Sequence, residues 1–226
     1  MLDLTTDKGR IVSAALGLAA EKPWGQVTLA EIAVRAGTTL VALKQDFASK
    51  GDILSTFARL VDDEVLRLTP QRSQDQSSRD ALFEVLMSRF DVLDPYKPAL
   101  RSIARSGAPE LQVVGQALCS QRWMLEAAGI NSGGIEGAVR TLGLTGIYAS
   151  VARAWLNDDD PGQAKTMAVL DRRLRTGQRT LEGLSGVGST ACRIGSSVLN
   201  ALGRLGKGTH SRSASEPPRE TSAPSA

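Results

Sequence analysis

The sequence is poor in the residues that usually carry catalysis and metal binding. Its 226 residues include one histidine and two cysteines. The histidine, His210, lies in a tail rich in Gly, Ser and Thr, and Cys119 and Cys192 stand far apart. We therefore expect no disulfide framework and no zinc site. Because no base, nucleophile or phosphate-binding glycine loop is apparent either, we predict a protein that is not an enzyme and holds no metal or cofactor.

Long apolar runs are also absent. The first residues, MLDLTTDKGR, have no apolar segment before a cleavage site, and no later stretch is long and uncharged enough to span a bilayer. Together with the low cysteine content, this pattern predicts a cytoplasmic protein.

An excess of positive charge is missing from most of the chain. The formal net charge is +3, and residues 186–226 carry all of it. Their charged residues are Arg193, Arg204, Lys207, Arg212 and Arg219 against Glu216 and Glu220. Residues 1–185 are therefore neutral, and any affinity for nucleic acid must come from a local patch rather than from a global field.

What the chain does contain is a stretch typical of a helix-turn-helix unit, TLAEIAVRAGTTLVALKQDFASKGD at residues 28–52. Thr28 and Glu31 have the spacing of a capping box, which predicts a helix that begins directly after Thr28. Gly37 can take the left-handed conformation that ends a helix, so the chain is expected to turn there.

A second short helix is predicted over Leu40–Asp46. Thr38 and Thr39 precede it as capping residues, and its apolar side chains recur at spacings of three and four. Ser49 and Asp52 form another capping box, which predicts a long helix over about residues 50–68.

Residues 8 to 54, approximately, resemble the N-terminal domain of the TetR/AcrR family of one-component bacterial regulators. The matching segments are RIVSAALGLAAEKPWGQVT, LAEIAVRAG and AGTTLVALKQDFASKGDIL. The resemblance implies a repressor-like transcription regulator that binds double-stranded DNA at a palindromic operator. It implies DNA contacts from Thr28, Thr38, Thr39, Leu40, Lys44 and Lys50.

Three positions depart from the family pattern. Val41 stands where glycine is usual, Lys44 where an aromatic residue is usual, and Asp46 where His or Tyr is common. A lysine can still contact phosphate, but an aspartate near the duplex is repelled by it. These departures weaken the expectation of DNA binding and leave the expected fold unchanged.

The rest of the ordered chain is predicted to be helical. Apolar residues repeat at helical spacing from Ile135 to Trp155 and again from Ala164 to Leu181, which indicates a matched pair of helices. In the resembled family the last two helices pack against a second copy, so we expect a homodimer. The alternative is that both helices are ordinary core helices of a monomer.

The fold class expected is thus all-α, with a three-helix helix-turn-helix head and a helical bundle for ligand binding and dimerisation. We place the head at residues 1–52, the bundle at 53–185 and a low-complexity tail at 186–226, the end of which is predicted to be disordered.

A second resemblance covers about residues 89–181. The segments RFDVLDPYKPALRSI, GLTGIYASVARAWLNDDDP and VLDRRL are similar to the lipid-binding accessory protein of ubiquinone biosynthesis. That resemblance implies a TetR-like fold that no longer binds DNA and holds an isoprenoid or other lipid. It also implies weak membrane-surface contact through an amphipathic stripe in residues 190–207, although a marginal helix without function fits that stripe equally well.

Under either resemblance a small hydrophobic ligand is expected in the bundle. The residues expected to line its cavity are Met87, Phe90, Tyr96, Trp123, Tyr148 and Trp155. The competing interpretation is that these side chains simply fill the core.

Overall fold

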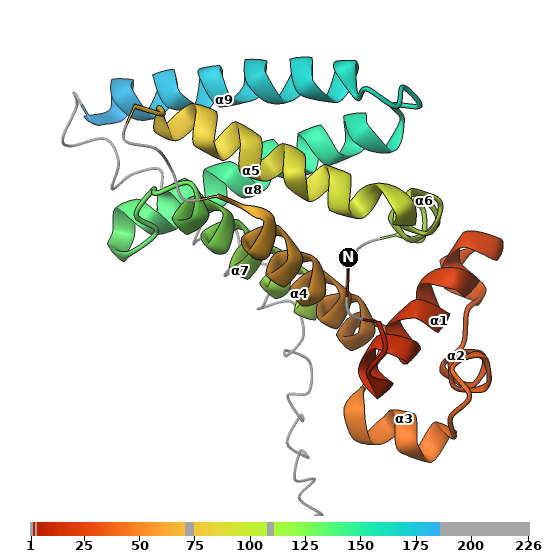
Figure 1. Cartoon of the computed structure of the whole chain (residues 1–226). Helices are drawn as coiled ribbons and strands as arrows, with labels where there is room; N and C mark the ends of the chain where they lie inside the picture. The colour runs from red at the N-terminus through yellow and green to blue at the C-terminus, as the bar shows by residue number, and fades with distance from the viewer. Residues whose placement is uncertain (1, 3, 71–74, 108–110, 186–226) are drawn as a thin grey trace, which may run out of the picture. The chain divides into compact units, whose positions relative to one another are not determined.

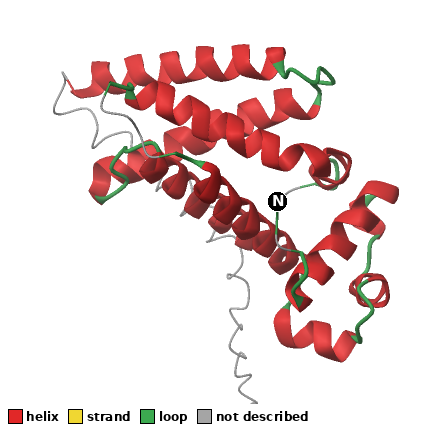
Figure 2. Ribbon diagram, in the orientation of Figure 1, coloured by secondary structure: helices red, strands yellow, loops and turns green. Residues whose placement is uncertain are grey.

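The computed structural model describes residues 2, 4–70, 75–107 and 111–185, and within these ranges every regular element is a helix (Figures 1 and 2). The elements are α1 (Asp7–Glu21), η1 (Trp24–Gln26), α2 (Leu29–Arg35), α3 (Leu40–Asp46), α4 (Lys50–Leu68), α5 (Ser78–Leu93), η2 (Asp94–Tyr96), α6 (Lys97–Ala104), α7 (Leu111–Ala127), α8 (Gly134–Leu156) and α9 (Ala164–Ser185). The predicted all-α fold class is confirmed. The predictions for residues 186–226 lie outside the described residues.

The helices of the head begin and end where local chemistry requires. Thr28 and Glu31 form the predicted capping box, in which each side chain bonds the other residue's backbone N–H. Gly37 follows α2 with a φ of 66°, a conformation in which a Cβ would be strained. Thr39 accepts a hydrogen bond from the backbone N–H of Ala42 and so caps α3.

A small apolar core holds α1, α2 and α3 together. Val12 and Ala15 of α1, Ile32 of α2 and Leu43 of α3 are at most 1 % exposed, and Phe47 closes the end of α3. Burial of such side chains is worth about 1.5–3 kcal/mol each, so packing rather than helix propensity stabilises these short helices.

Helix α4 runs from the head into the body, where it packs on α5 and α7 (Figure 1). Val61 and Val65 on its inner side are fully buried. Residues 1–182 form one compact unit, so the head and the bundle share packing through this helix. The boundary at residue 52 stays a prediction.

The body is centred on aromatic and charged side chains that meet across helices. Phe90 stacks on Tyr148 with ring centroids 5.3 Å apart, and Trp155 lies 5.4 Å from Phe90. Beside them, the guanidinium of Arg89 donates to Asp62 and, over 3.1 Å, to the hydroxyl of Tyr148. Both charged partners are about 5 % exposed, so a buried ion pair joins α4 to α5, and the hydrogen bond to Tyr148 joins α8 to α5.

Helix α8 has one buried and one open side. Gly137 faces the preceding turn so closely that an added Cβ would lie 2.1 Å from the carbonyl group of Ser132. On the open side, Ile135, Val139 and Leu142 are 88 %, 44 % and 50 % exposed, and a Cβ added at Gly143 would meet nothing within 4 Å. The residues that the structure describes therefore leave an apolar stripe on α8 exposed.

Candidate nucleic-acid interface

The outer surface of α3 exposes two apolar side chains and one lysine. Leu40 and Val41 are 51 % and 73 % exposed, and Lys44 beside them is exposed as well. Val34 of α2 is another exposed apolar side chain of the head, at 80 %. A short capped helix of this kind has the dimensions that enter a major groove.

Two of the three threonines predicted to contact DNA, Thr28 and Thr39, cap helices, whereas Thr38, also predicted as a capping residue, does not cap α3. The Thr28 hydroxyl donates to the Glu31 carboxylate over 2.9 Å and accepts from the Glu31 N–H over 3.2 Å. The Thr39 hydroxyl accepts from the Ala42 N–H over 3.1 Å, while Thr38 is half-buried in the turn after Gly37. Thr28 and Thr39 remain exposed, so capping does not hide either side chain from a duplex.

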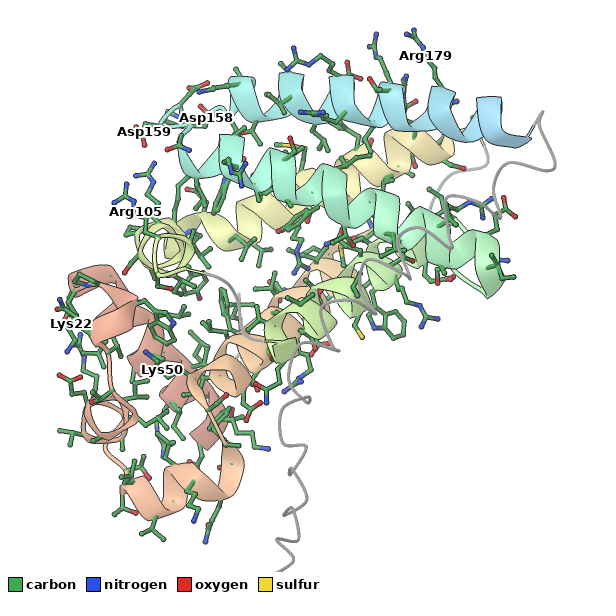
Figure 3. All side chains as sticks on the ribbon, turned by 180° about the vertical axis from the view of Figure 1, so that it is seen from behind. Lys22, Lys50, Arg105, Asp158, Asp159 and Arg179 are labelled. Carbon is green, nitrogen blue, oxygen red and sulfur yellow. The ribbon has the colours of Figure 1, made fainter. Side chains whose placement is uncertain are left out.

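The ammonium of Lys50 binds groups within the head, unlike a lysine that is exposed to contact a phosphate. It donates to the backbone carbonyls of Trp24 and Val27, each over 2.9 Å, and lies 4.7 Å from the centre of the Trp24 ring. Two of the three ammonium donors are therefore engaged within the head. Figure 3 shows Lys50 inside the head and Lys22 at its outer edge.

Most other cations of the head are paired with carboxylates. Arg35 binds Glu21 through two hydrogen bonds, and Lys22 binds Glu31 over 2.5 Å. Asp46, the departure noted in α3, lies 3.4 Å from the ammonium of Lys8. Among the described residues of the head, Lys44 is the cation that makes no ion pair or hydrogen bond.

The head consequently has little unbalanced charge. Residues 1–52 contain Lys8, Arg10, Lys22, Arg35, Lys44 and Lys50 against Asp3, Asp7, Glu21, Glu31, Asp46 and Asp52. Binding to a duplex would thus depend on Lys44 and on groove contacts from α3, because phosphate attraction scales with the number of unpaired cations.

The pairing also shifts the acidity of Glu31. Hydrogen bonds from Lys22 and, next, from Thr28 lower the pKa of its carboxyl from 4.5 to about 2. The negative charge of Glu31 lies in the first turn of α2, where it also complements the helix dipole.

Helix α6 connects the head with the turn between α8 and α9. The Ser102 hydroxyl accepts from the backbone N–H of Trp24 over 2.9 Å and donates to the carbonyl of Lys22 over 3.1 Å. One residue earlier, Arg101 donates to the carboxylate of Asp159 over 2.5 Å. Asp159 lies with Asp158 in the turn between α8 and α9 (Figure 3). Nothing in the local sequence around Ser102 indicates this link, because its partners lie about 80 residues away.

The six predicted ligand-pocket residues are divided among four environments. Phe90, Tyr148 and Trp155 pack together in the core, and Tyr96 packs edge-on against Phe57 of α4. Trp123 on α7 is 55 % exposed, whereas Met87 lines a groove between α5 and the start of α9. That these residues share one ligand cavity stays a prediction.

The described residues contain no cluster of three or more metal-binding side chains. Within the same residues, no helix combines the length and the apolar character that crossing a membrane would require.

Comparison with known proteins gives two family matches. Residues 11–56, which span α1 to α3 and the start of α4, match the model for bacterial regulatory proteins of the tetR family. Residues 11–56 form a TetR-type domain. Residues 139–180, within α8 and α9, match the COQ9 family. The assignment to a regulator-type domain agrees with the prediction that the chain is not an enzyme.

Solved structures share the TetR-like fold over about three quarters of the chain. A TetR transcriptional regulator from Nitrosomonas europaea shares 22 % identity at a TM-score of 0.59, over 76 % of this chain and 97 % of that one. A TetR transcriptional regulator from Rhodococcus sp. RHA1 shares 24 % identity at 0.55, with the same coverage. No curated protein matches the chain.

Proposed function

We propose that the chain is a one-component transcriptional regulator that binds a palindromic operator as a homodimer and responds to a small hydrophobic ligand. The observation that carries this proposal is the TetR-type domain at residues 11–56, in which both short helices are capped and α3 is exposed. Leu40 and the Thr39 methyl are suited to contact thymine methyl groups, while Lys44 is suited to contact a phosphate.

The uncovered stripe of α8 supports the homodimer. Ile135, Val139 and Leu142 follow one another at spacings of four and three, so they lie on one side of the helix. A second copy would remove this apolar surface from water, and a two-fold dimer would present two α3 helices to a palindrome.

The contacts of α6 support a route from ligand to head. Arg101 holds the turn between α8 and α9 at one end of the route, and Ser102 holds the backbone around Trp24 at the other. A shift of α8 or α9 on ligand binding would therefore be transmitted to the TetR-type domain, which changes the spacing of the two heads in a dimer.

Selection of bound fragments from random DNA tests the proposal. An enriched palindrome is the expected result. Lys44→Ala should weaken binding to every sequence and reduce the slope of log affinity against log salt by about 2, as expected for one lost phosphate contact in each of the two subunits. Lys165→Ala, which removes an exposed lysine of α9, is the matched control and should change neither. An unchanged salt slope for the Lys44 variant would contradict its role.

A second candidate function is a lipid-binding accessory protein that no longer binds DNA. It is favoured by the COQ9 match at residues 139–180 and by the balanced charge of the head. Under this function the exposed Val34, Leu40 and Val41 would meet an apolar partner in place of a duplex. Absence of any enriched DNA, together with an isoprenoid lipid extracted from the purified protein, would favour this function over regulation.

A further inference from the structure

A groove of about 400 Å³ lies between α5 and the first residues of α9, outside the aromatic cluster of the core. Apolar side chains supply much of its wall, with Phe83 and Met87 from α5 and Met167 from α9. Methionine is unbranched and polarizable, so a wall of this kind adapts to ligands of varied shape. The full lining is Phe83, Glu84, Met87, Ser88, Asp91, Pro161, Gly162, Gln163 and Met167.

The charged groups of the groove are all negative. Among the described residues, Glu84 makes no ion pair or hydrogen bond, and Asp91 accepts only from the neutral side-chain amide of Gln163, over 2.8 Å. Two carboxylates without a cationic partner at one apolar groove create a local negative potential. Such a site attracts a cation and repels an anion of the same size.

Gln163 provides an independent indication of a ligand. Its side chain is 7 % exposed and its amide nitrogen is bound to Asp91, but its carbonyl oxygen Oε1 has no hydrogen-bond donor. Its backbone has a φ of 51°, which is unfavourable for a residue with a Cβ. A buried carbonyl oxygen without a donor costs about 1–3 kcal/mol, and an N–H supplied from the groove would recover that cost.

We propose that this groove binds a lipophilic ammonium compound. The apolar part of the ligand contacts Phe83, Met87 and Met167, the positive charge lies between Glu84 and Asp91, and an N–H of the ammonium bonds Gln163 Oε1. The aromatic ring of Phe83 favours this ligand class, because a ring face attracts a nearby cation, and the two thioethers adapt to the shape of its apolar part. The site concerns the body alone and does not depend on DNA binding by the head.

Four phenylbutyl compounds separate the contributions of the positive charge, the N–H donors and the apolar group to binding. Their affinities are measured by calorimetric titration of the full chain without DNA. The 4-phenylbutylammonium ion carries both charge and N–H donors, its trimethylammonium analogue keeps the charge alone, 4-phenylbutanol is neutral, and 4-phenylbutyrate is an anion. We expect affinity to fall in that order, with the carboxylate at least about tenfold weaker than the ammonium ion. Equal binding of the carboxylate would overturn the proposal. Equal binding of the trimethyl analogue would overturn the role of Gln163.

Substitutions of the two groove carboxylates test where the positive charge of the ligand lies. Glu84→Gln and Asp91→Asn should each weaken ammonium binding about threefold to fivefold, as expected for loss of one partly exposed ionic contact. Asp63→Asn, which neutralises an exposed carboxylate of α4 outside the groove, should leave the affinity unchanged. If both groove variants bind as tightly as the Asp63 variant, the assignment is wrong.

Methionine methyl NMR locates the apolar part. The chain has four methionines, of which Met87 and Met167 line the groove and Met124 is fully buried elsewhere in the core. Addition of 4-phenylbutylammonium should move the methyl signals of Met87 and Met167 and leave that of Met124 in place. A shift confined to Met124, or no shift at all, would place the ligand outside the groove and overturn the proposal. Because no DNA is present, a negative result here leaves the regulator function standing.

Discussion

The polar contacts described within the head and within the body differ in how far apart in sequence their partners lie. In the head, the contacts that set where the helices begin are caps between residues three apart, such as Thr28 with Glu31. In the body, Arg89 and Asp62 are 27 residues apart and both are buried. Local caps fix where helices begin, whereas a buried ion pair fixes how helices pack. The difference implies that removing one polar group costs far more in the body than in the head.

The sharpest test of this comparison is Asp62→Asn. The change leaves the Arg89 guanidinium buried without its ion-pair partner, and it also weakens the bond that Ser120 donates over 2.6 Å. Breaking a buried pair in this way lowers the free energy of unfolding by about 3–5 kcal/mol. Urea denaturation followed by circular dichroism measures the loss.

Two further variants show whether burial of charge is the cause. Asp63→Asn neutralises the exposed neighbour and should change stability by less than about 0.5 kcal/mol. The double variant Asp62→Leu, Arg89→Met removes both charges together and should regain most of the loss, because no unpaired charge is then left inside. A single variant as stable as Asp63→Asn would refute the contrast drawn between body and head.

A second large effect is expected at Gly137 in the first turns of α8. An alanine Cβ there would lie 2.1 Å from the backbone carbonyl group of Ser132, so the turn before α8 must move. Overpacking of this kind costs about 1–3 kcal/mol. Gly115→Ala in α7 is the control, because a Cβ added there would meet nothing within 4 Å, and it should stabilise by about 0.5–1 kcal/mol. Thermal unfolding that moves both variants in the same direction would contradict this account.

The same contrast explains what could be predicted from the sequence. The bounds of α3 and α4 follow the prediction because caps, a glycine turn and apolar periodicity all act within a few residues. The family resemblance added the order of the elements.

The sequence contains no comparable indication of contacts between helices that are distant in sequence. Trp123 and Trp155 both fit an apolar helical pattern, yet one is 55 % exposed and the other is 2 % exposed. The sequence around Asp46 does not indicate its ion-pair partner, since Lys8 lies on a different helix. Side-chain type and spacing indicate which face is apolar, but the partner of each residue depends on packing between helices that are distant in sequence.

In the head, loss of a single cap should have a moderate effect. Thr28→Ala removes the acceptor of the Glu31 N–H and should lower the free energy of unfolding by about 1 kcal/mol. Thr28→Ser keeps the hydroxyl and should restore most of that stability. Chemical denaturation of the three proteins measures the difference. A loss as large as that of Asp62→Asn would show that the head depends on its polar groups as strongly as the body does.

The smallest expected effect is the pH dependence of the Glu31 contact. Because hydrogen bonds from Lys22 and Thr28 lower its pKa in the folded protein to about 2, ionised Glu31 stabilises the fold above the ordinary pKa of 4.5. This contribution is lost as pH falls from 4.5 towards 2. Glu31→Gln cannot titrate, so the stability difference between wild type and this variant should shrink over that interval. Other carboxylates are common to both proteins and cancel. A difference that stays constant down to pH 2 would show that Lys22 and Thr28 do not stabilise the ionised carboxylate.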